Sequence, residues 1–326
     1  MIFRETTVAT VAVNVRPRSG PYGGANQWAR QVCGSLRRCG YRVVHTLRPG
    51  VDAVLGTHLG LSGTLAFTWA EVAAAKKRSP RMRVIQRVND NDVRKGTREM
   101  SDSLAEANSI ADHTVFVSSW LRDHHAARWF DLSRPHSVIE PGSDPSVFHP
   151  IGNRPWQVGQ PFRFVTHHWS DNMSKGFDVY SEMDRLIAEE KARGFELWVI
   201  GRWPASISWR AARTFPACSG RALADLLRKC HAYVSASRFE PGAMHPVEGI
   251  QCGLPLLYHG DSGGTASLGE QFGLVLDADV VGSMEAMRGT YERLRTAVLG
   301  APPSGDRMCL EYRRLVQREI SAAAEP

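Results

Sequence analysis

Short β-branched runs alternate with amphipathic stretches twice along the chain, and this alternation constrains the fold most. Residues 7–15 are rich in valine and threonine, which is typical of a strand buried on both faces. In residues 25–39, Trp28, Val32 and Leu36 recur every fourth position, which predicts a helix. The series continues with predicted strands at 41–47, 52–55, 83–88, 113–117 and 137–140, and helices at 67–77, 97–108 and 118–129. Such a series specifies a parallel sheet with helices on both faces.

Residues 141–161 interrupt the alternation, since they contain five prolines, which is typical of a linker. The alternation then resumes with predicted strands at 162–166, 196–200, 232–236 and 254–258, and helices at 177–193, 219–229, 244–252, 282–299 and 306–323. The sequence therefore predicts an α/β protein of two Rossmann-like, doubly wound parallel-sheet domains that face each other across a cleft. Because such sheets bind ligands at the carboxyl ends of their strands, the cleft is the expected site.

Composition excludes several classes of protein. The chain has 326 residues, of which 43% are hydrophobic and 22% charged, so a disordered or fibrous chain is disfavoured. It has no run of about 20 apolar residues that could span a membrane, and its start does not resemble a signal peptide. The six cysteines never occur as Cys-x-x-Cys, so we expect free thiols and no metal site. These features predict a cytoplasmic protein.

The positive charge is concentrated in the first half of the chain. Residues 1–150 contain 20 Lys and Arg against 13 Asp and Glu, whereas residues 151–326 contain 20 of each. This imbalance predicts that an anionic partner meets the first half. A bias toward arginine, which outnumbers lysine 34 to 6, is the alternative explanation. No nucleic-acid partner is expected, because nothing resembles a base-reading module.

The first predicted strand and helix are joined by residues 19–24, which include Gly23 and Gly24. Two glycines at a helix start let a ligand approach the backbone, and the helix N-terminus favours an anion. A plain tight turn is the alternative. The pattern is not Gly-x-Gly-x-x-Gly, and the second strand ends without the acidic residue that holds a ribose. A nicotinamide-dependent oxidoreductase is therefore disfavoured.

Donors and acceptors crowd the end of the predicted strand at 83–88. Arg87, Asn89, Asp90 and Asp92 lie in this run, which suits binding of an acceptor rich in hydroxyl groups. A solvated turn is the alternative. The Asp-x-Asp pair could in principle hold a metal ion, but it follows a strand of the first of two domains, where such metal pairs are not expected.

The second domain holds two further motifs. Lys175 and Gly176 stand at a helix start, where an ammonium group and free backbone N–H groups would converge on a diphosphate. A solvent-exposed lysine is the alternative. Glu240 and Glu248 are eight residues apart across a loop that enters a helix, so N–H groups near 242–245 would face a ligand. Glu248 could accept hydrogen bonds from a ribose diol.

These motifs together resemble the GT-B glycosyltransferases, and more narrowly the large family 4 of retaining nucleotide-sugar transferases. The resemblance spans nearly the whole chain. It rests on Gly23-Gly24, the runs 115–120, 138–144 and 148–150, Lys175-Gly176-Phe177-Asp178, the run 199–201, the Glu240 to Glu248 block with Gly253-Leu254-Pro255, and Ser262-Gly263-Gly264. It implies an acceptor-binding domain at 1–150 and a donor-binding domain at 151–305. We expect the helix at 306–326 to pack back on the first domain.

The resemblance also implies roles for individual residues. Lys175 would bind the donor diphosphate and Glu240 the transferred sugar, and these two are the candidate catalytic residues. The backbone of Gly242, Ala243 and Met244 would surround the sugar and phosphate, and Glu248 would hold the ribose. Gly23 and Gly24 would let the first domain close on the phosphate. The acceptor would meet Arg87, Asn89, Asp90 and Asp92.

The chain departs from the family pattern in one place that matters for charge. The family usually has an arginine five or six residues before the lysine, whereas this chain has His168 and Trp169 there. A second positive group at the diphosphate is therefore unassigned, and His168, Arg202 and Arg238 are the candidates. Arg87 also lies in the region where many members place a histidine near the transferred sugar.

The expected activity is retaining transfer of a sugar from a nucleoside-diphosphate sugar to a hydroxyl acceptor, with no metal and no other cofactor. The acceptor could be a glycan, a small molecule or a lipid-linked, anionic compound. The basic first half would then make weak peripheral contact with the inner face of a membrane. The alternative function is a non-catalytic nucleotide-sugar or glycan-binding protein of the same fold.

Overall fold

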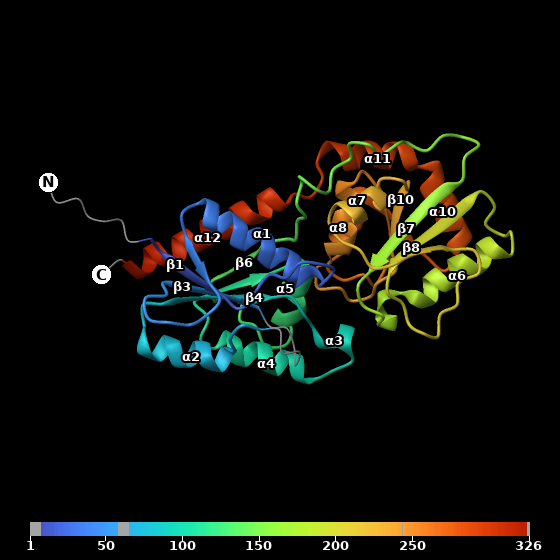
Figure 1. The fold of residues 1–326 in the computed structure, drawn as a ribbon. Helices are drawn as coiled ribbons and strands as arrows, with labels where there is room; N and C mark the ends of the chain where they lie inside the picture. The colour runs from blue at the N-terminus through green and yellow to red at the C-terminus, as the bar shows by residue number, and fades with distance from the viewer. Residues whose placement is uncertain (1–7, 58–64, 243, 325–326) are drawn as a thin grey trace.

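The computed structural model describes residues 8–57, 65–242 and 244–324, which form two six-stranded sheets flanked by helices (Figure 1). All strand pairs within the two sheets are parallel. The first sheet has the order β2-β1-β3-β4-β5-β6 and the second the order β12-β11-β10-β7-β8-β9. Two doubly wound sheets were the prediction, and the structure confirms it.

The elements of the first sheet alternate as the sequence predicts, with one short additional helix. They are β1 (Thr10–Val13), α1 (Gly24–Arg38), β2 (Arg42–Val44), β3 (Ala53–Thr57), α2 (Trp69–Arg78), β4 (Arg83–Val88), α3 (Asp92–Lys95), α4 (Glu99–Asn108), β5 (His113–Phe116), α5 (Ser119–Ala126) and β6 (His136–Val138).

The second half of the chain builds the other sheet and three closing helices. Its elements are β7 (Phe162–His168), the 3-10 turn η1 (Met173–Lys175), α6 (Phe177–Ala188), β8 (Phe195–Gly201), β9 (Arg213–Phe215), α7 (Arg221–Leu227), β10 (Ala232–Ser235), α8 (Met244–Gln251), β11 (Leu256–His259), α9 (Ala266–Phe272), β12 (Gly273–Leu276), α10 (Val280–Gly289), α11 (Tyr291–Gly300) and α12 (Gly305–Ala324).

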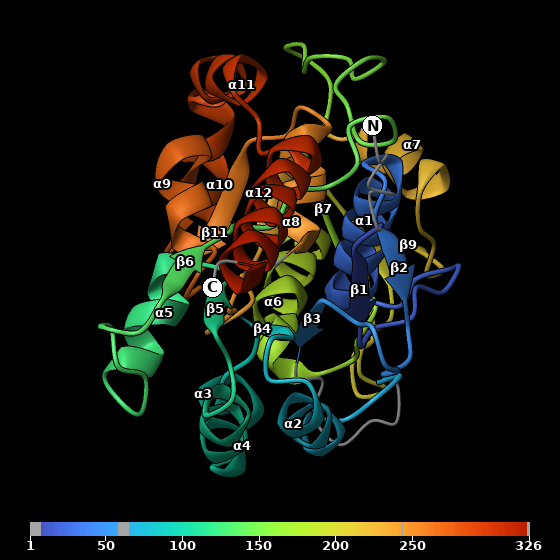
Figure 2. The ribbon, with the colours of Figure 1, turned by 90° about the vertical axis from the view of Figure 1, so that its left-hand side faces the viewer.

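The end of the chain returns to the first sheet. Helix α12 lies beside α1 on one face of that sheet, while α2 and α4 cover the other face (Figures 1 and 2). Trp28 of α1 and Tyr312 of α12 are buried with their rings in edge-to-face contact, 5.7 Å between centroids. Burial of such large aromatic side chains stabilises the contact. Residues 305–324 therefore belong to the core of the first half.

The sequence pattern missed several elements of the second half. The predicted single helix at 282–299 is wrong, since α10 ends at Gly289 and α11 begins at Tyr291. Strands β9 and β12 and helix α9 were not predicted either. They are three, four and seven residues long, too short for hydrophobic periodicity to distinguish them from loops.

The carboxyl ends of the two sheets meet directly. The side-chain amide of Asn91 donates to the carbonyl oxygen of Phe239 at 2.9 Å, and the hydroxyl of Ser118 donates to the carbonyl oxygen of Pro241. A Cβ atom at Gly242 would lie 2.8 Å from the carbonyl oxygen of Val117, which only glycine avoids here. The loop before α8 is thus held against the first sheet. In the part of the chain that the structure describes, no helix is both long and apolar enough to cross a membrane.

Three buried histidines make the stability of the fold sensitive to acid. Burial lowers the pKa of His113, His125 and His231 from 6.5 to about 4. Between pH 6.5 and pH 4 the unfolded chain binds more protons than the folded chain. The free energy of unfolding therefore decreases by about 1.4 kcal/mol, for each histidine, with every unit by which the pH is lowered. We expect the melting temperature, followed by circular dichroism, to fall steadily from pH 6.5 to pH 4.5. A flat profile would contradict this prediction. His231→Asn should make the slope shallower.

Candidate active site

A cleft of about 370 Å³ lies between the carboxyl ends of the two sheets. From the first half it is lined by the loop before α1 and by the end of β4. From the second half it is lined by the ends of β7 and β8, by residues that follow β7, β9 and β10, and by α8. Strands β7 and β10 are neighbours whose connections leave in opposite directions, and such a switch point is where doubly wound sheets bind ligands. The expected position of the site is therefore where the structure has its cleft.

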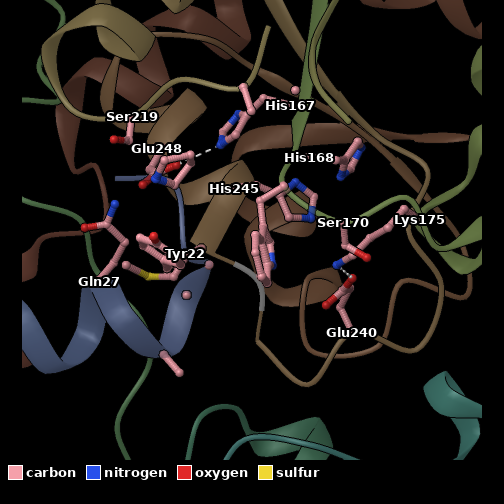
Figure 3. Close-up of a pocket in the computed structure, with 18 of the residues that line it drawn as sticks. Tyr22, Gln27, His167, His168, Ser170, Lys175, Ser219, Glu240, His245 and Glu248 are labelled. Atoms are coloured by element: carbon pink, nitrogen blue, oxygen red, sulfur yellow. Dashed lines mark hydrogen bonds and ion pairs between the residues drawn. The ribbon is translucent and has the colours of Figure 1, made fainter. Parts of the chain in front are cut away.

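A buried ion pair lies at this switch point. Lys175, which follows β7, donates from Nζ to Oε1 of Glu240, which follows β10 (Figure 3). Glu240 is 4% exposed. Burial raises the pKa of Glu240, but the Lys175 and Arg94 cations outweigh burial and lower that pKa below its ordinary value. The structure thus brings together the two predicted catalytic residues, and Glu240 is ionised.

Arg94 supplies a second cation that sequence reasoning missed. It belongs to α3, lines the cleft, and donates from Nη2 to Oδ1 of Asp90 at 2.8 Å. Burial lowers the pKa of Arg94, but Glu240 and Asp90 together raise it. The guanidinium group of Arg94, from the first half, therefore interacts electrostatically with Glu240. The sequence signal was the dense run at 87–96, within which spacing did not distinguish Arg94 from its neighbours.

A chain of hydrogen bonds connects Glu248 of α8 through His167 and Tyr233 to His245. His167 donates from Nε2 to Oε2 of Glu248 at 2.8 Å, since a carboxylate can only accept. Nδ1, the other ring nitrogen of His167, lies 3.1 Å from the hydroxyl of Tyr233 and can accept from it. When the hydroxyl of Tyr233 donates its proton to His167, its oxygen can accept from Nδ1 of His245, 3.0 Å away. This pattern of hydrogen bonds places a proton on Nε2 of His167 and on Nδ1 of His245.

His245 was also missed by the sequence reasoning, although it stands between the two glutamates. Burial lowers the pKa of His245 well below its ordinary value, so the ring is neutral. With its proton on Nδ1, Nε2 carries a lone pair that has no partner within the described residues, and the residue lines the cleft (Figure 3). His245 can therefore accept a hydrogen bond from a hydroxyl group of a ligand.

The glycine pair of the first half lies against the second half. A Cβ atom at Gly23, where φ is +78°, would lie 2.8 Å from Nε1 of Trp169. A Cβ atom at Gly24 would lie 3.1 Å from Cγ of Met244. Tyr22 and Trp169 face each other across the cleft with 6.4 Å between ring centroids. The N-terminus of α1 thus approaches the loop of the glutamate pair. Closure of the first half on a phosphate stays a prediction.

The predicted acceptor residues divide into two groups. Arg87, Asn89 and Asp90 line the cleft. Asp92 does not, and we correct that prediction. Its carboxylate accepts from the backbone N–H groups of Met100 and Ser101, each at 2.9 Å, and from the hydroxyl of Thr97. Asp92 therefore stabilises the first turn of α4.

Of the three candidates for the second positive group, only His168 is among the described residues that line the cleft. Arg238 lies outside the cleft, paired with Asp178 at 2.7 Å. Arg202 also lies outside, with its guanidinium 5.5 Å from the ring of Trp169. His168 lines the cleft, but burial lowers its pKa well below the ordinary value, so it is neutral. The contacts that place these three side chains connect residues distant in sequence. Spacing along the sequence alone does not reveal such contacts.

The remaining predicted donor residues are placed as follows. Gly242, Met244 and Glu248 line the cleft together with Gly23, Gly24 and Lys175. Ala243 lies outside the described residues. Within 8–57, 65–242 and 244–324, no three His, Cys, Asp or Glu side chains are grouped so that they could hold a metal ion.

Comparison with known proteins supports the fold. No protein-family model and no curated protein matches the chain. Among solved structures, sucrose-phosphate synthase from Thermosynechococcus elongatus matches with a TM-score of 0.72 and 14% identity, over 96% of this chain and 100% of that one. A glycosyltransferase from Rickettsia africae matches with a TM-score of 0.65 and 14% identity, over 96% and 99%. The pneumococcal O-GlcNAc transferase GtfA, solved with UDP and GlcNAc, matches with a TM-score of 0.59 and 12% identity. The match covers 82% of this chain and 57% of that one. The chain has the GT-B fold.

Proposed function

We propose that the protein is a retaining glycosyltransferase, which moves a sugar from a nucleoside-diphosphate sugar to a hydroxyl acceptor without a metal. The observation that carries this proposal is the buried Lys175 and Glu240 pair with Arg94 beside it. A lysine at the switch point and an arginine from the first half suit a diphosphate leaving group, because fixed charges in a water-poor site stabilise charge that develops in the transition state. A carboxylate between them suits the hydroxyl groups of a sugar.

The second half of the cleft fits the rest of such a donor. Glu248 lies on α8 with its carboxylate held by His167, and a carboxylate in that place can bind a ribose diol. Ile200, Ala217 and Leu223 add apolar surface to the same cleft, which suits a nucleobase. GtfA, whose structure contains UDP and GlcNAc, supports this class of donor.

The chemistry of the proposed reaction needs little from the protein beyond position and charge. In retaining transfer on one face of the sugar, the leaving diphosphate helps to take the proton of the acceptor hydroxyl. The protein then holds donor and acceptor in reactive contact and stabilises the departing phosphate. Weak contact between the basic first half and an anionic membrane surface stays a prediction.

Donor binding and turnover can be tested separately. UDP-, GDP-, ADP- and TDP-sugars are screened by thermal shift, where a donor at 100 times its Kd should stabilise the fold by about 2.7 kcal/mol. Hydrolysis of the bound donor is then followed by release of the free nucleotide. Stabilisation with no hydrolysis and no transfer to any acceptor would favour the alternative, a non-catalytic nucleotide-sugar-binding protein.

The stereochemistry of the product tests the mechanism. We expect an α-linked donor to give an α-linked product, since we assign Glu240 and Glu248 to the donor and neither to attack on the sugar carbon. Proton NMR of the first product formed reports the anomeric configuration of the new linkage. A β-linked product would contradict retention and leave glycosyl transfer itself intact.

A further inference from the structure

Arg87 is a buried charge with no ion-pair partner among the described residues. It stands near the carboxyl end of β4, is 4% exposed, and lines the cleft. Its Nε and Nη1 atoms are buried and donate to no acceptor in the described part of the chain. Its guanidinium lies 4.6 Å from the ring centre of Trp28 and beside Tyr312. Aromatic rings favour a cation, but they do not replace a carboxylate.

Other arginines of the same region are paired. Arg83, on the same strand, bonds Glu319 at 2.7 Å and lies 3.3 Å from Asp112. Arg94 bonds Asp90. A buried charge without a partner is strongly unfavourable, and proteins almost always pair such groups or bind a ligand to them. The unpaired guanidinium of Arg87 therefore suits an anionic group of a bound ligand.

A helix N-terminus adds to the positive potential beside Arg87. Helix α1 has 15 residues, starts at Gly24, has no side-chain cap and has no acidic residue in its first turn. Gly24 and Gln27 line the cleft with Arg87, and Trp28, one turn into the helix, contacts the guanidinium. Free N–H groups at such a terminus bind anions. The N-terminus and the unpaired guanidinium thus adjoin the same part of the cleft.

We propose that Arg87 and the first turn of α1 form a subsite for an anionic group, a phosphate or a carboxylate, that the acceptor carries. This assignment replaces the donor-phosphate role that the resemblance implied for Gly23 and Gly24. This inference rests on the proposed function, because it assumes that the donor diphosphate occupies the Lys175 and Arg94 side of the cleft. Arg87 belongs to the first sheet, which is the half of the chain that holds the excess positive charge. The acceptor is then a phosphorylated or carboxylated hydroxyl compound rather than a neutral sugar.

Inorganic phosphate is the probe that tests the subsite, titrated at constant ionic strength against sodium chloride and followed by thermal shift. Lys175→Ala should keep the phosphate response, whereas Arg87→Met should weaken phosphate binding at least 10-fold. Without ligand, Arg87→Met should melt about 2–4 °C higher than the wild type, because the unpaired charge is gone. An unchanged phosphate response in Arg87→Met, or a lower melting temperature of that variant without ligand, would overturn the proposal.

Arg83→Met is the matched control, since it removes a paired guanidinium from the same strand. It should lower the melting temperature and leave the phosphate response intact. Loss of the response in Arg83→Met as well would mean that phosphate acts through general charge, which also overturns the subsite.

Nucleotide and hexose probes distinguish the acceptor from the donor as the source of the anion. Glucose 6-phosphate should stabilise the wild type more than glucose does, and Arg87→Met should abolish this difference. The affinity of Arg87→Met for nucleoside diphosphates should stay within about twofold of the wild type. A tenfold loss of that affinity would assign Arg87 to the donor and overturn the acceptor assignment. If no nucleotide binds any variant, the proposed function fails while the phosphate result still decides the subsite.

Discussion

Lys175→Ala is expected to weaken binding of the nucleotide-sugar donor, or its turnover, by about 10- to 200-fold. A charge-assisted hydrogen bond contributes about 1.5–3 kcal/mol. The Lys175 ammonium group bonds Glu240 at the switch point of the second sheet, and its side chain is 13% exposed. The substitution also leaves Glu240 with Arg94 as its remaining neighbouring cation. Part of the loss should therefore come from a carboxylate that now repels the diphosphate.

Two measurements keep this result interpretable. Donor affinity is measured by calorimetry, and far-UV circular dichroism checks that the variant is folded. Lys191→Ala is the control for loss of a lysine, because the Lys191 side chain is 60% exposed and bonds a surface glutamate. If Lys175→Ala binds and turns over the donor as the wild type does, Lys175 is not a diphosphate ligand.

Most helices and strands could be predicted from the sequence because the burial of a strand or a helix produces a hydrophobic pattern within its own residues. A strand covered on both faces is an uninterrupted apolar run, and a helix on a sheet has an apolar face every three to four residues. The strands that surround the cleft, β1, β4, β7 and β10, were all found this way. The two glutamates and Lys175 were found because a loop that enters a helix is also a local feature.

The missing parts of the site depend on contacts between distant residues. Arg94 and Glu240 are near each other because Asn91 bonds the backbone of Phe239 across the two halves. The role of Tyr233 follows from hydrogen bonds to His167 and His245, which come from different elements. No spacing rule indicates such a network. Asp92 was misassigned for the same reason, since its partners lie in the next helix.

Glu240→Gln is expected to lower turnover by tens- to hundreds-fold while the protein stays folded, which corresponds to about 1.4 kcal/mol for each factor of ten. Glutamine keeps the shape of the side chain and can still accept a hydrogen bond, but it removes the negative charge between Lys175 and Arg94. Lys175 would then lose its carboxylate partner, whereas Arg94 would keep Asp90. The sugar hydroxyl groups would lose their strongest acceptor. Initial rates and donor affinity, measured separately, show whether the loss lies in turnover or in binding.

Asp90→Asn provides the comparison on the other side of the cleft. Asp90 also lines the cleft and accepts from Arg94, so it is the carboxylate that an inverting mechanism would use as a base. If Glu240 orients the donor and Asp90 contacts the acceptor, Asp90→Asn should weaken acceptor use and leave slow donor hydrolysis intact. Glu190→Gln, a change at a side chain that is 73% exposed, should alter neither rate. Total loss of activity in Asp90→Asn together with a β-linked product would make Asp90 the base, because retention on one face of the sugar requires no carboxylate there.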